Sequence, residues 1–174
     1  MGAVLIEDEL EFDFAAAIRA ERFEDITYKM SHCMKSIDFI VEWDEELWFI
    51  EVKDPDNSKI PSKSKKHERR QFFEKFKSHT LFSKELGPKI KDSFLYLHLQ
   101  KNLPDKPIKY YVLIAMKMLS PALLSSANDQ LKISSCLLGP DNSAWPNKYL
   151  DGVAVFNKAT WNEKLKQCPV TRNI

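Results

Sequence analysis

Residues 37–54 read IDFIVEWDEELWFIEVKD, two apolar runs joined by a short acidic turn. The runs 37–43 and 47–53 are rich in β-branched and aromatic residues, which predicts two strands. The acidic residues between them suit a tight hairpin turn. Three ionisable residues occupy strand positions where apolar side chains would pack better, namely Asp38, Glu51 and Lys53. Charged side chains are rarely buried without a partner or a metal ion, so this stretch predicts a functional site.

The length of the hairpin turn decides which of these side chains face each other. With a two-residue turn at residues 44–45, Asp38 lies directly opposite Glu51, whereas a loop two residues longer places it opposite Lys53. Both registers put all three residues on one face, because side chains alternate along a strand and paired residues share a face. A three-residue loop or a bulge would break this relation.

The chemistry of the three side chains predicts hydrolysis of a phosphodiester. Two carboxylates about 5 Å apart repel each other, and each becomes easier to protonate. A divalent cation removes the conflict, and Mg²⁺ prefers one or two carboxylates plus waters, which leaves positions for phosphate oxygens. Lys53 could stabilise charge developing on the phosphate, or help to orient and deprotonate the attacking water. We therefore expect Mg²⁺ or Mn²⁺ as the cofactor.

The flanking sequence predicts one α/β domain over residues 1–174. Helices are expected over 10–22, from 67 to 86, over 87–99, over 120–132 and from a capping box at Thr160 and Glu163. Besides the hairpin, strands are expected over 25–30, over 108–118 and over 151–157, with a loop over 54–66. The expected fold is an αβββαβ core, with a mixed central sheet and helices on both faces.

Asp38, an apolar strand, a turn and then Glu51-Val52-Lys53 at the end of a second strand resemble the motif of the PD-(D/E)XK superfamily, the restriction-endonuclease-like nucleases. The resemblance covers the αβββαβ order over residues 8–157, although only three residues carry the motif and Ile37 replaces the expected proline. It implies that Asp38 and Glu51 are metal ligands and that Lys53 is the catalytic lysine.

The same resemblance implies further site residues on two helices. Many members of the superfamily add an acidic residue from the first helix. Glu11, near the start of the expected helix, is our first candidate for a third metal ligand, and Glu21 is the alternative. The helix after the third strand often carries a Gln or Lys near the site, and Gln71 and Lys75 could fill that place. An exposed helix face is the alternative for this pair.

Charge is unevenly distributed, although the formal net charge is only +1. The first 25 residues are acidic and residues 59–77 are basic. The basic segment follows the motif strand directly, so it should emerge beside the site and hold phosphates without reading sequence. Its candidate nucleic-acid-binding residues are Lys63, Lys65, Lys66, Arg69 and Arg70, together with Gln71 and Lys75. A solvated surface is the alternative for this charge run.

DNA is the expected substrate, because most relatives by resemblance act on DNA, and a homodimer or a partner protein could supply targeting. A prokaryotic defence or genome-maintenance role is expected by analogy alone. The alternatives are an RNase on the same scaffold and a non-catalytic module that binds nucleic acid or protein. Three cysteines without metal-ligand spacing, no secretory segment and no apolar run of roughly 20 residues predict a cytoplasmic protein with no membrane partner. The chain also has no Gly-rich phosphate loop, which disfavours a P-loop nucleotide hydrolase.

Overall fold

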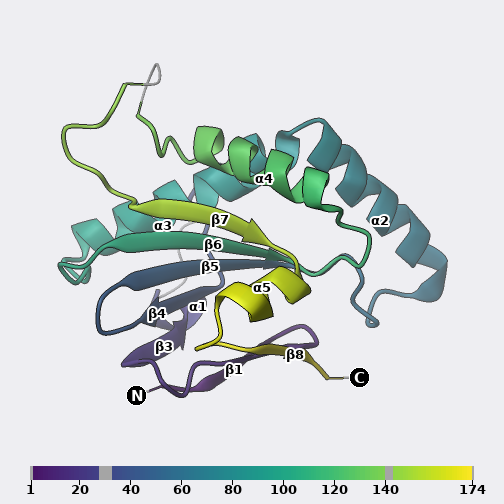
Figure 1. Ribbon diagram of the computed structural model, residues 1–174, viewed down its shortest axis with the longest axis horizontal. Coiled ribbons are helices and arrows are strands. Elements are labelled where there is room, and N and C mark those ends of the chain that lie inside the picture. The colour runs from purple at the N-terminus through teal and green to yellow at the C-terminus, as the bar shows by residue number, and fades with distance from the viewer. Residues whose placement is uncertain (1, 28–32, 140–142, 174) are drawn as a thin grey trace.

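The two apolar runs of the motif form adjacent antiparallel strands in the middle of the main sheet. They are β4 (Phe39–Glu42) and β5 (Leu47–Lys53). Their side chains are almost all buried, because both faces of the sheet are covered. The hairpin expected over residues 37–54 is therefore confirmed. The computed structural model describes residues 2–27, 33–139 and 143–173 (Figure 1).

The main sheet has five strands in the order β3-β4-β5-β6-β7. Strands β3, β4 and β5 form an antiparallel meander, β6 is parallel to β5, and β7 is parallel to β6. A second sheet has three strands in the order β1-β2-β8. The remaining strands are β1 (Val4–Glu7), β2 (Leu10–Asp13), β3 (Arg19–Arg22), β6 (Ile108–Ile114), β7 (Gly152–Phe156) and β8 (Val170–Arg172).

The helices are α1 (Phe23–Ile26), α2 (Ser62–Lys77), the π-helix η1 (Leu81–Leu86), α3 (Gly87–Leu99), α4 (Pro121–Ser134) and α5 (Lys158–Lys164). The parallel strands β5 and β6 are connected by α2, η1 and α3, and β6 and β7 by α4. As expected, Ser120 caps α4, where its side chain accepts a hydrogen bond from the backbone of Leu123. In the part of the chain that the structure describes, no helix is both long and apolar enough to cross a bilayer.

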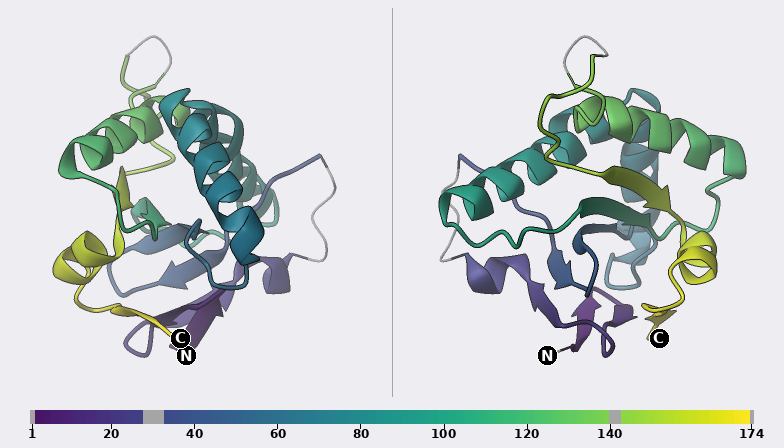
Figure 2. Two further views of the ribbon diagram at one scale, coloured as in Figure 1. Left: turned by 90° about the vertical axis from the view of Figure 1, so that its right-hand side faces the viewer. Right: turned by 60° about the vertical axis from the view of Figure 1, so that its left-hand side comes forward.

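The main sheet separates two apolar cores. On one face, Ile40, Phe49 and Tyr110 pack against α2, η1, α3 and α4. On the other face, Phe39 and Trp48 pack against α5 and the three-stranded sheet. Figures 1 and 2 show this arrangement, with the long helices on one side of the main sheet and the smaller sheet with α5 on the other. The mixed α/β class is thus confirmed, but a second sheet takes much of the face where a helix layer was expected.

The helix expected over residues 10–22 is wrong. This segment contains β2 and β3, which belong to different sheets. Leu10, Phe12 and Phe14 alternate with polar residues and are fully buried, which is the period of a strand. That alternation outweighs the helix propensity of the alanines at 15–17. The strand expected over 25–30 is also wrong in its described part, because Asp25 and Ile26 lie in α1, while residues 28–30 lie outside the described residues.

Two helix starts differ from expectation. The loop expected over 54–66 ends earlier, because α2 begins at Ser62, so the first basic residues of the segment lie on a helix. The cap of α5 is Asn157 rather than Thr160. Thr160 is the third residue of that capping box, and its backbone donates to the Asn157 side chain at 2.8 Å.

Candidate active site

Asp38 directly precedes β4, and Glu51 lies near the end of the adjacent strand β5. The backbone N–H of Trp43 donates to the Glu46 carbonyl at 2.9 Å, which closes a two-residue turn, so the shorter of the two expected turns is the observed one. The ladder pairs Phe39 with Ile50 and ends there, and the backbone N–H of Asp38 donates to the same Ile50 at 3.0 Å. Glu51, two residues after Phe49, is on the sheet face that the long helices cover, and its charge acts on Asp38.

Glu51 is a buried carboxylate with one oxygen paired and one oxygen without a partner. Its side chain is 1% exposed. Its Oε1 accepts from Lys89 Nζ at 2.6 Å and lies 3.1 Å from Lys53 Nζ. Among the described residues, buried Oε2 has no hydrogen-bond partner. Leaving a buried carboxylate oxygen unpaired is costly, so Oε2 is a position where a cation would be stabilised.

Asp38 is fixed at the end of the same hairpin by a hydrogen bond, and its pKa is raised. Its Oδ2 accepts a 2.7 Å hydrogen bond from the backbone N–H of Val52. Burial, followed by the charge of Glu51, raises the pKa of Asp38 to about 7, although Lys89 and the Val52 N–H act in the opposite direction. The ionised pair Asp38 and Glu51 is therefore incompletely neutralised by the side chains around it.

This electrostatic conflict predicts that Asp38→Asn stabilises the metal-free protein at alkaline pH. The folded protein keeps the Asp38 proton up to about pH 7, whereas an unperturbed carboxyl releases it near 3.8. Between these values the folded state holds more protons, so stability falls as pH rises. The full interval corresponds to about 4 kcal/mol at most. After allowance for solvent screening we expect about 1 to 2 kcal/mol at pH 8.

Thermal unfolding in EDTA measures this effect. At pH 8 the Tm of Asp38→Asn should exceed that of the wild type by about 3 to 6 °C, and the difference should shrink towards pH 4. Asp25→Asn is the matched control, because Asp25 is exposed on α1 and should show no such pH-dependent gain. A variant with equal or lower Tm than the wild type at pH 8 would contradict the proposed repulsion.

Lys53 links Glu51 to a second ion-pair partner, Glu85 of η1. Lys53 Nζ lies 3.6 Å from Glu85 Oε2, and Lys75 Nζ lies 2.8 Å from Glu85 Oε1. Burial lowers the pKa of Lys53, but the charge and hydrogen bond of Glu51 outweigh it and the pKa is raised. Burial likewise raises the pKa of Glu85, but Lys75 and Lys53 outweigh it and the pKa is lowered. Both groups are therefore charged at neutral pH.

Because Glu85 holds two lysines that a phosphate would need, Glu85→Gln should strengthen nucleic-acid binding. The variant removes a negative charge and frees Lys53 and Lys75 to contact phosphate. We expect the Kd for duplex DNA, measured in Ca²⁺ at low salt, to fall about 3- to 10-fold. Glu45→Gln is the control, because it removes the same charge at an exposed position in the turn between β4 and β5. An affinity of Glu85→Gln equal to or weaker than that of the wild type would contradict this role.

α3 brings Lys89 to the site. Ser93, one turn after Lys89, is buried and its Oγ accepts from the backbone N–H of Ile37, directly before Asp38. α3 is therefore fixed against the start of β4, with Lys89 reaching Glu51. Gly87 opens α3 where a Cβ would lie 2.4 Å from the Ser134 carbonyl of α4. A larger residue at 87 would push the two helices apart.

Tyr110 of β6 lies beneath the carboxylates. It is fully buried, and its hydroxyl donates to the Leu86 carbonyl at 3.1 Å. Burial, with smaller contributions from Glu51 and Asp38, holds the pKa of Tyr110 well above its ordinary value. Tyr110 is therefore a neutral structural residue rather than a proton donor at physiological pH.

The expected third acidic ligand from the N-terminal segment is not brought to the site as the sequence implied. Glu11 lies on β2 in the smaller sheet, where its Oε2 accepts from Asn173, so this expectation is wrong. Glu21 lies on β3 rather than on a helix, opposite Ile40. Its Oε2 lies 3.5 Å from Arg19 Nε and, among the described residues, has no hydrogen-bond partner. In the described ranges, no three His, Cys, Asp or Glu side chains are grouped to hold a metal.

Glu7 is an acidic residue of the N-terminal segment that does lie within electrostatic reach of Asp38. It ends β1 and pairs with Arg22 at 2.7 Å. Burial, opposed by Arg22 and reinforced by the charge of Asp38, raises the pKa of Glu7. Sequence reasoning missed Glu7 because this residue precedes the expected helix over 10–22 and lies outside the resemblance over 8–157.

The basic residues of the expected nucleic-acid surface lie along α2, and only one of them enters the ion-pair chain of the site. Lys75 forms an ion pair with Glu85. Gln71 is exposed on the same helix and does not take part in these ion pairs. Lys63, Lys66, Arg69 and Arg70 are exposed on the same helix, and Lys65 is half-buried. The site lysine that the sequence missed is Lys89. The sequence feature that could have indicated Lys89 is the helix start at Gly87-Pro88, because Lys89 lies in the first turn of that helix.

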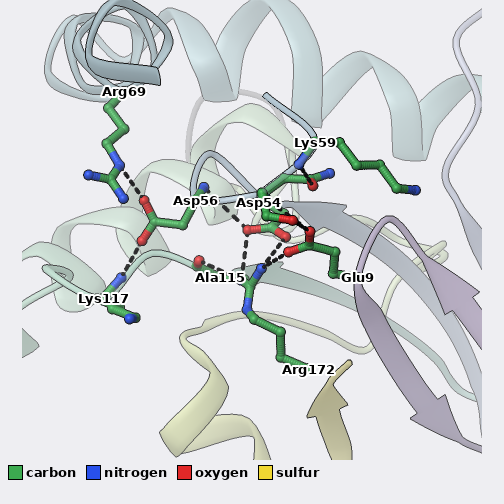
Figure 3. Close-up of polar contacts among 10 residues, drawn as sticks. Glu9, Asp54, Asp56, Lys59, Arg69, Ala115, Lys117 and Arg172 are labelled. Carbon is green, nitrogen blue, oxygen red and sulfur yellow. Dashed lines mark hydrogen bonds and ion pairs between the residues drawn. The ribbon is translucent and has the colours of Figure 1, made fainter. Parts of the chain in front are cut away.

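A buried ion-pair network fixes the chain directly after Lys53 (Figure 3). The guanidinium of Arg172, from β8, donates two bonds of 2.8 Å to Asp54, whose side chain is 0% exposed, and one of 3.0 Å to Glu9. Asp56 accepts from Arg69 Nε at 2.5 Å and from the Lys117 backbone at 3.2 Å. The C-terminal strand, the first hairpin and the start of α2 are thereby tied to the end of β5.

Comparison with known protein families, with curated proteins and with solved structures gives no significant match. The function must therefore be argued from the site itself. Two carboxylates, one with an unpaired buried oxygen, fit a hard divalent cation that completes its shell with waters. Lys53 and Lys89 add positive charge beside them, where a phosphate could bind.

Proposed function

We propose that this chain is a metal-dependent nuclease of the PD-(D/E)XK type. One observation carries the proposal: buried Glu51 has an unpaired Oε2, and its charge helps burial to raise the pKa of nearby Asp38 to about 7. Such a pair of carboxylates is stabilised by a divalent cation. The position of Lys53, two residues beyond Glu51 and 3.1 Å from it, supplies the third group of the motif.

The topology supports the restriction-endonuclease-like assignment. The meander β3-β4-β5, a helical crossover and a parallel β6 reproduce the βββαβ part of the expected core. The long N-terminal helix of that core is missing from the described residues, since α1 covers only Phe23–Ile26. The catalytic hairpin and its crossover are therefore supported better than the N-terminal part of the resemblance.

The proposed residues divide the work of hydrolysis among them. Asp38 and Glu51 would hold Mg²⁺ or Mn²⁺, which supplies Lewis-acid activation of the phosphate and of a bound water. Lys53 would orient the water that attacks phosphorus and stabilise the charge that develops as the bond to the leaving oxygen breaks. Lys89 donates a hydrogen bond to Glu51 in the metal-free protein and could contact the phosphate once a cation binds that carboxylate.

DNA is the proposed substrate, by the resemblance of the motif, and the basic face of α2 would bind its phosphates. An RNase on the same scaffold, or a binding module without catalysis, are the alternatives. We also propose that a homodimer or a partner protein supplies targeting, and that the protein serves prokaryotic defence or genome maintenance in the cytoplasm.

Incubation of the purified protein with supercoiled plasmid and linear DNA tests the proposal. We expect cleavage in Mg²⁺ and in Mn²⁺ and none in EDTA. Structured and single-stranded RNA offered in parallel distinguish an RNase. Binding of nucleic acid without cleavage in any metal would contradict the enzyme and support the module.

A further inference from the structure

A groove of about 650 Å³ lies on α2 and on the segment that follows β6. Its apolar lining comes from Phe73, Met116 and Met118. Met118 is 84% exposed, whereas Phe73 is half-buried and Met116 is buried. An apolar side chain exposed in a groove offers apolar contact area to a bound molecule.

The groove carries an excess of positive charge. Its two acids are already paired: Asp56 with Arg69 Nε at 2.5 Å, and Glu74 with Arg70 Nε at 2.9 Å. Two further lysines lie beside the apolar lining. Lys77 Nζ lies 4.8 Å from the centre of the Phe73 ring, and Lys117 is exposed next to Met118. The groove thus combines an aromatic ring, thioethers and two cations beyond those that its own acids neutralise.

The groove opens at the sheet edge where the candidate active site lies. Ile114, the last residue of β6, is opposite Lys53, and the backbone N–H of Ala115 donates to the Lys53 carbonyl at 2.8 Å. Met116 to Met118 leave the sheet from this point. Phe73 and Lys75 are two residues apart on α2, so their side chains point to different sides of the helix. α2 therefore stands between the groove and the ion pairs around Lys53.

We propose that this groove binds an unpaired strand of the nucleic-acid substrate, an inference that rests on the proposed nuclease function. A base stacks on Phe73 in place of Lys77, whose flexible side chain moves aside to contact a backbone phosphate, while Met118 packs against the bases and Lys117 contacts phosphate as well. Stacking on a ring with flanking cations tolerates any base, so it gives affinity for single strands without sequence preference. A fully paired duplex cannot offer its base faces to the ring. The groove therefore favours DNA that has a single-stranded end or gap over a fully paired duplex.

Fluorescence anisotropy with a labelled single-stranded oligonucleotide and a matched blunt duplex, in Ca²⁺, tests this site. Met118→Glu should weaken single-strand binding about ten-fold and duplex binding far less. Lys117→Glu should weaken single-strand binding as well. Both positions are exposed, so neither change should disturb folding. Ile133→Glu and Lys166→Glu make the same charge changes at exposed positions outside the groove and should leave single-strand affinity unchanged.

The outcomes separate the groove from the nuclease. If Met118→Glu binds single strands as the wild type does, or loses single-strand and duplex affinity equally, the groove proposal is overturned. If that result is accompanied by metal-dependent cleavage of DNA by the wild type, the proposed function stands without the groove. If the wild type neither binds nor cleaves nucleic acid, both proposals fail.

Discussion

Lys53→Ala should lower kcat for DNA cleavage about 10²- to 10³-fold, which is the loss expected when one group that stabilises the transition state is removed. Lys53 lies 3.1 Å from Glu51 and is charged, so its ammonium group is available at the proposed site of phosphate chemistry. Single-turnover cleavage in Mg²⁺ measures the chemical step directly, since steady-state rates can reflect product release.

Metal binding distinguishes a lost catalytic group from a damaged site. Lys53 is not a proposed metal ligand, so 10 mM Mg²⁺ should raise the Tm of Lys53→Ala and of the wild type by a similar few degrees. Lys59→Ala is the control, because Lys59 is exposed on the loop after β5 and should cleave normally. Wild-type cleavage by Lys53→Ala, or loss of the Mg²⁺-dependent gain in Tm, would show that the role assigned to Lys53 is wrong.

Arg172→Ala should destabilise the protein by about 3 kcal/mol, because it leaves Asp54 as a buried charge without its bidentate partner. The Asp54 side chain is 0% exposed and that of Arg172 is 18% exposed, so water can replace the guanidinium only poorly. Glu9 loses a partner in the same change. For a chain of 174 residues the expected fall in Tm is about 6 to 12 °C.

Two further variants test the origin of this loss. Arg172→Ala combined with Asp54→Asn should recover part of the stability, because the buried charge is removed with its partner. Arg70→Ala is the exposed comparison, because its pair with Glu74 lies on the surface of α2 and should contribute about 0.5 kcal/mol or less. If denaturant unfolding shows a loss below about 1 kcal/mol for Arg172→Ala, the network does not stabilise the fold as argued.

The central part of the fold was predictable because local pattern and tertiary environment agree there. The β4–β5 hairpin and the run that forms β6 are apolar stretches of strand composition, and Ser120-Pro121 is a strong helix start. The N-terminal segment was misread because three alanines favour a helix locally. Burial of Phe12 and Phe14 against Phe39 decides the structure instead, and this contact is visible only in the folded chain.

The part of the site that depends on the alternation of side chains along the strands could be predicted from the sequence. The part that depends on how the helices pack on the sheet could not. Alternation suffices to place Glu51 and Lys53 on one face, and the two-residue turn brings Asp38 to the same end of the hairpin. Lys89 and Glu85 reach Glu51 and Lys53 only because η1 and α3 follow α2 across the sheet. No short-range sequence pattern predicts this arrangement of helices. The pairing of Arg172 with Asp54 joins positions 118 residues apart and was equally hidden.

Anomalous diffraction from a crystal soaked in Mn²⁺ tests the central claim most directly. The account predicts one strong peak between the Asp38 carboxylate and Glu51 Oε2, and its loss in Glu51→Gln crystals soaked in the same way. No peak there in the wild type, or a peak that persists unchanged in Glu51→Gln, would contradict the proposal that these two carboxylates hold a catalytic metal ion.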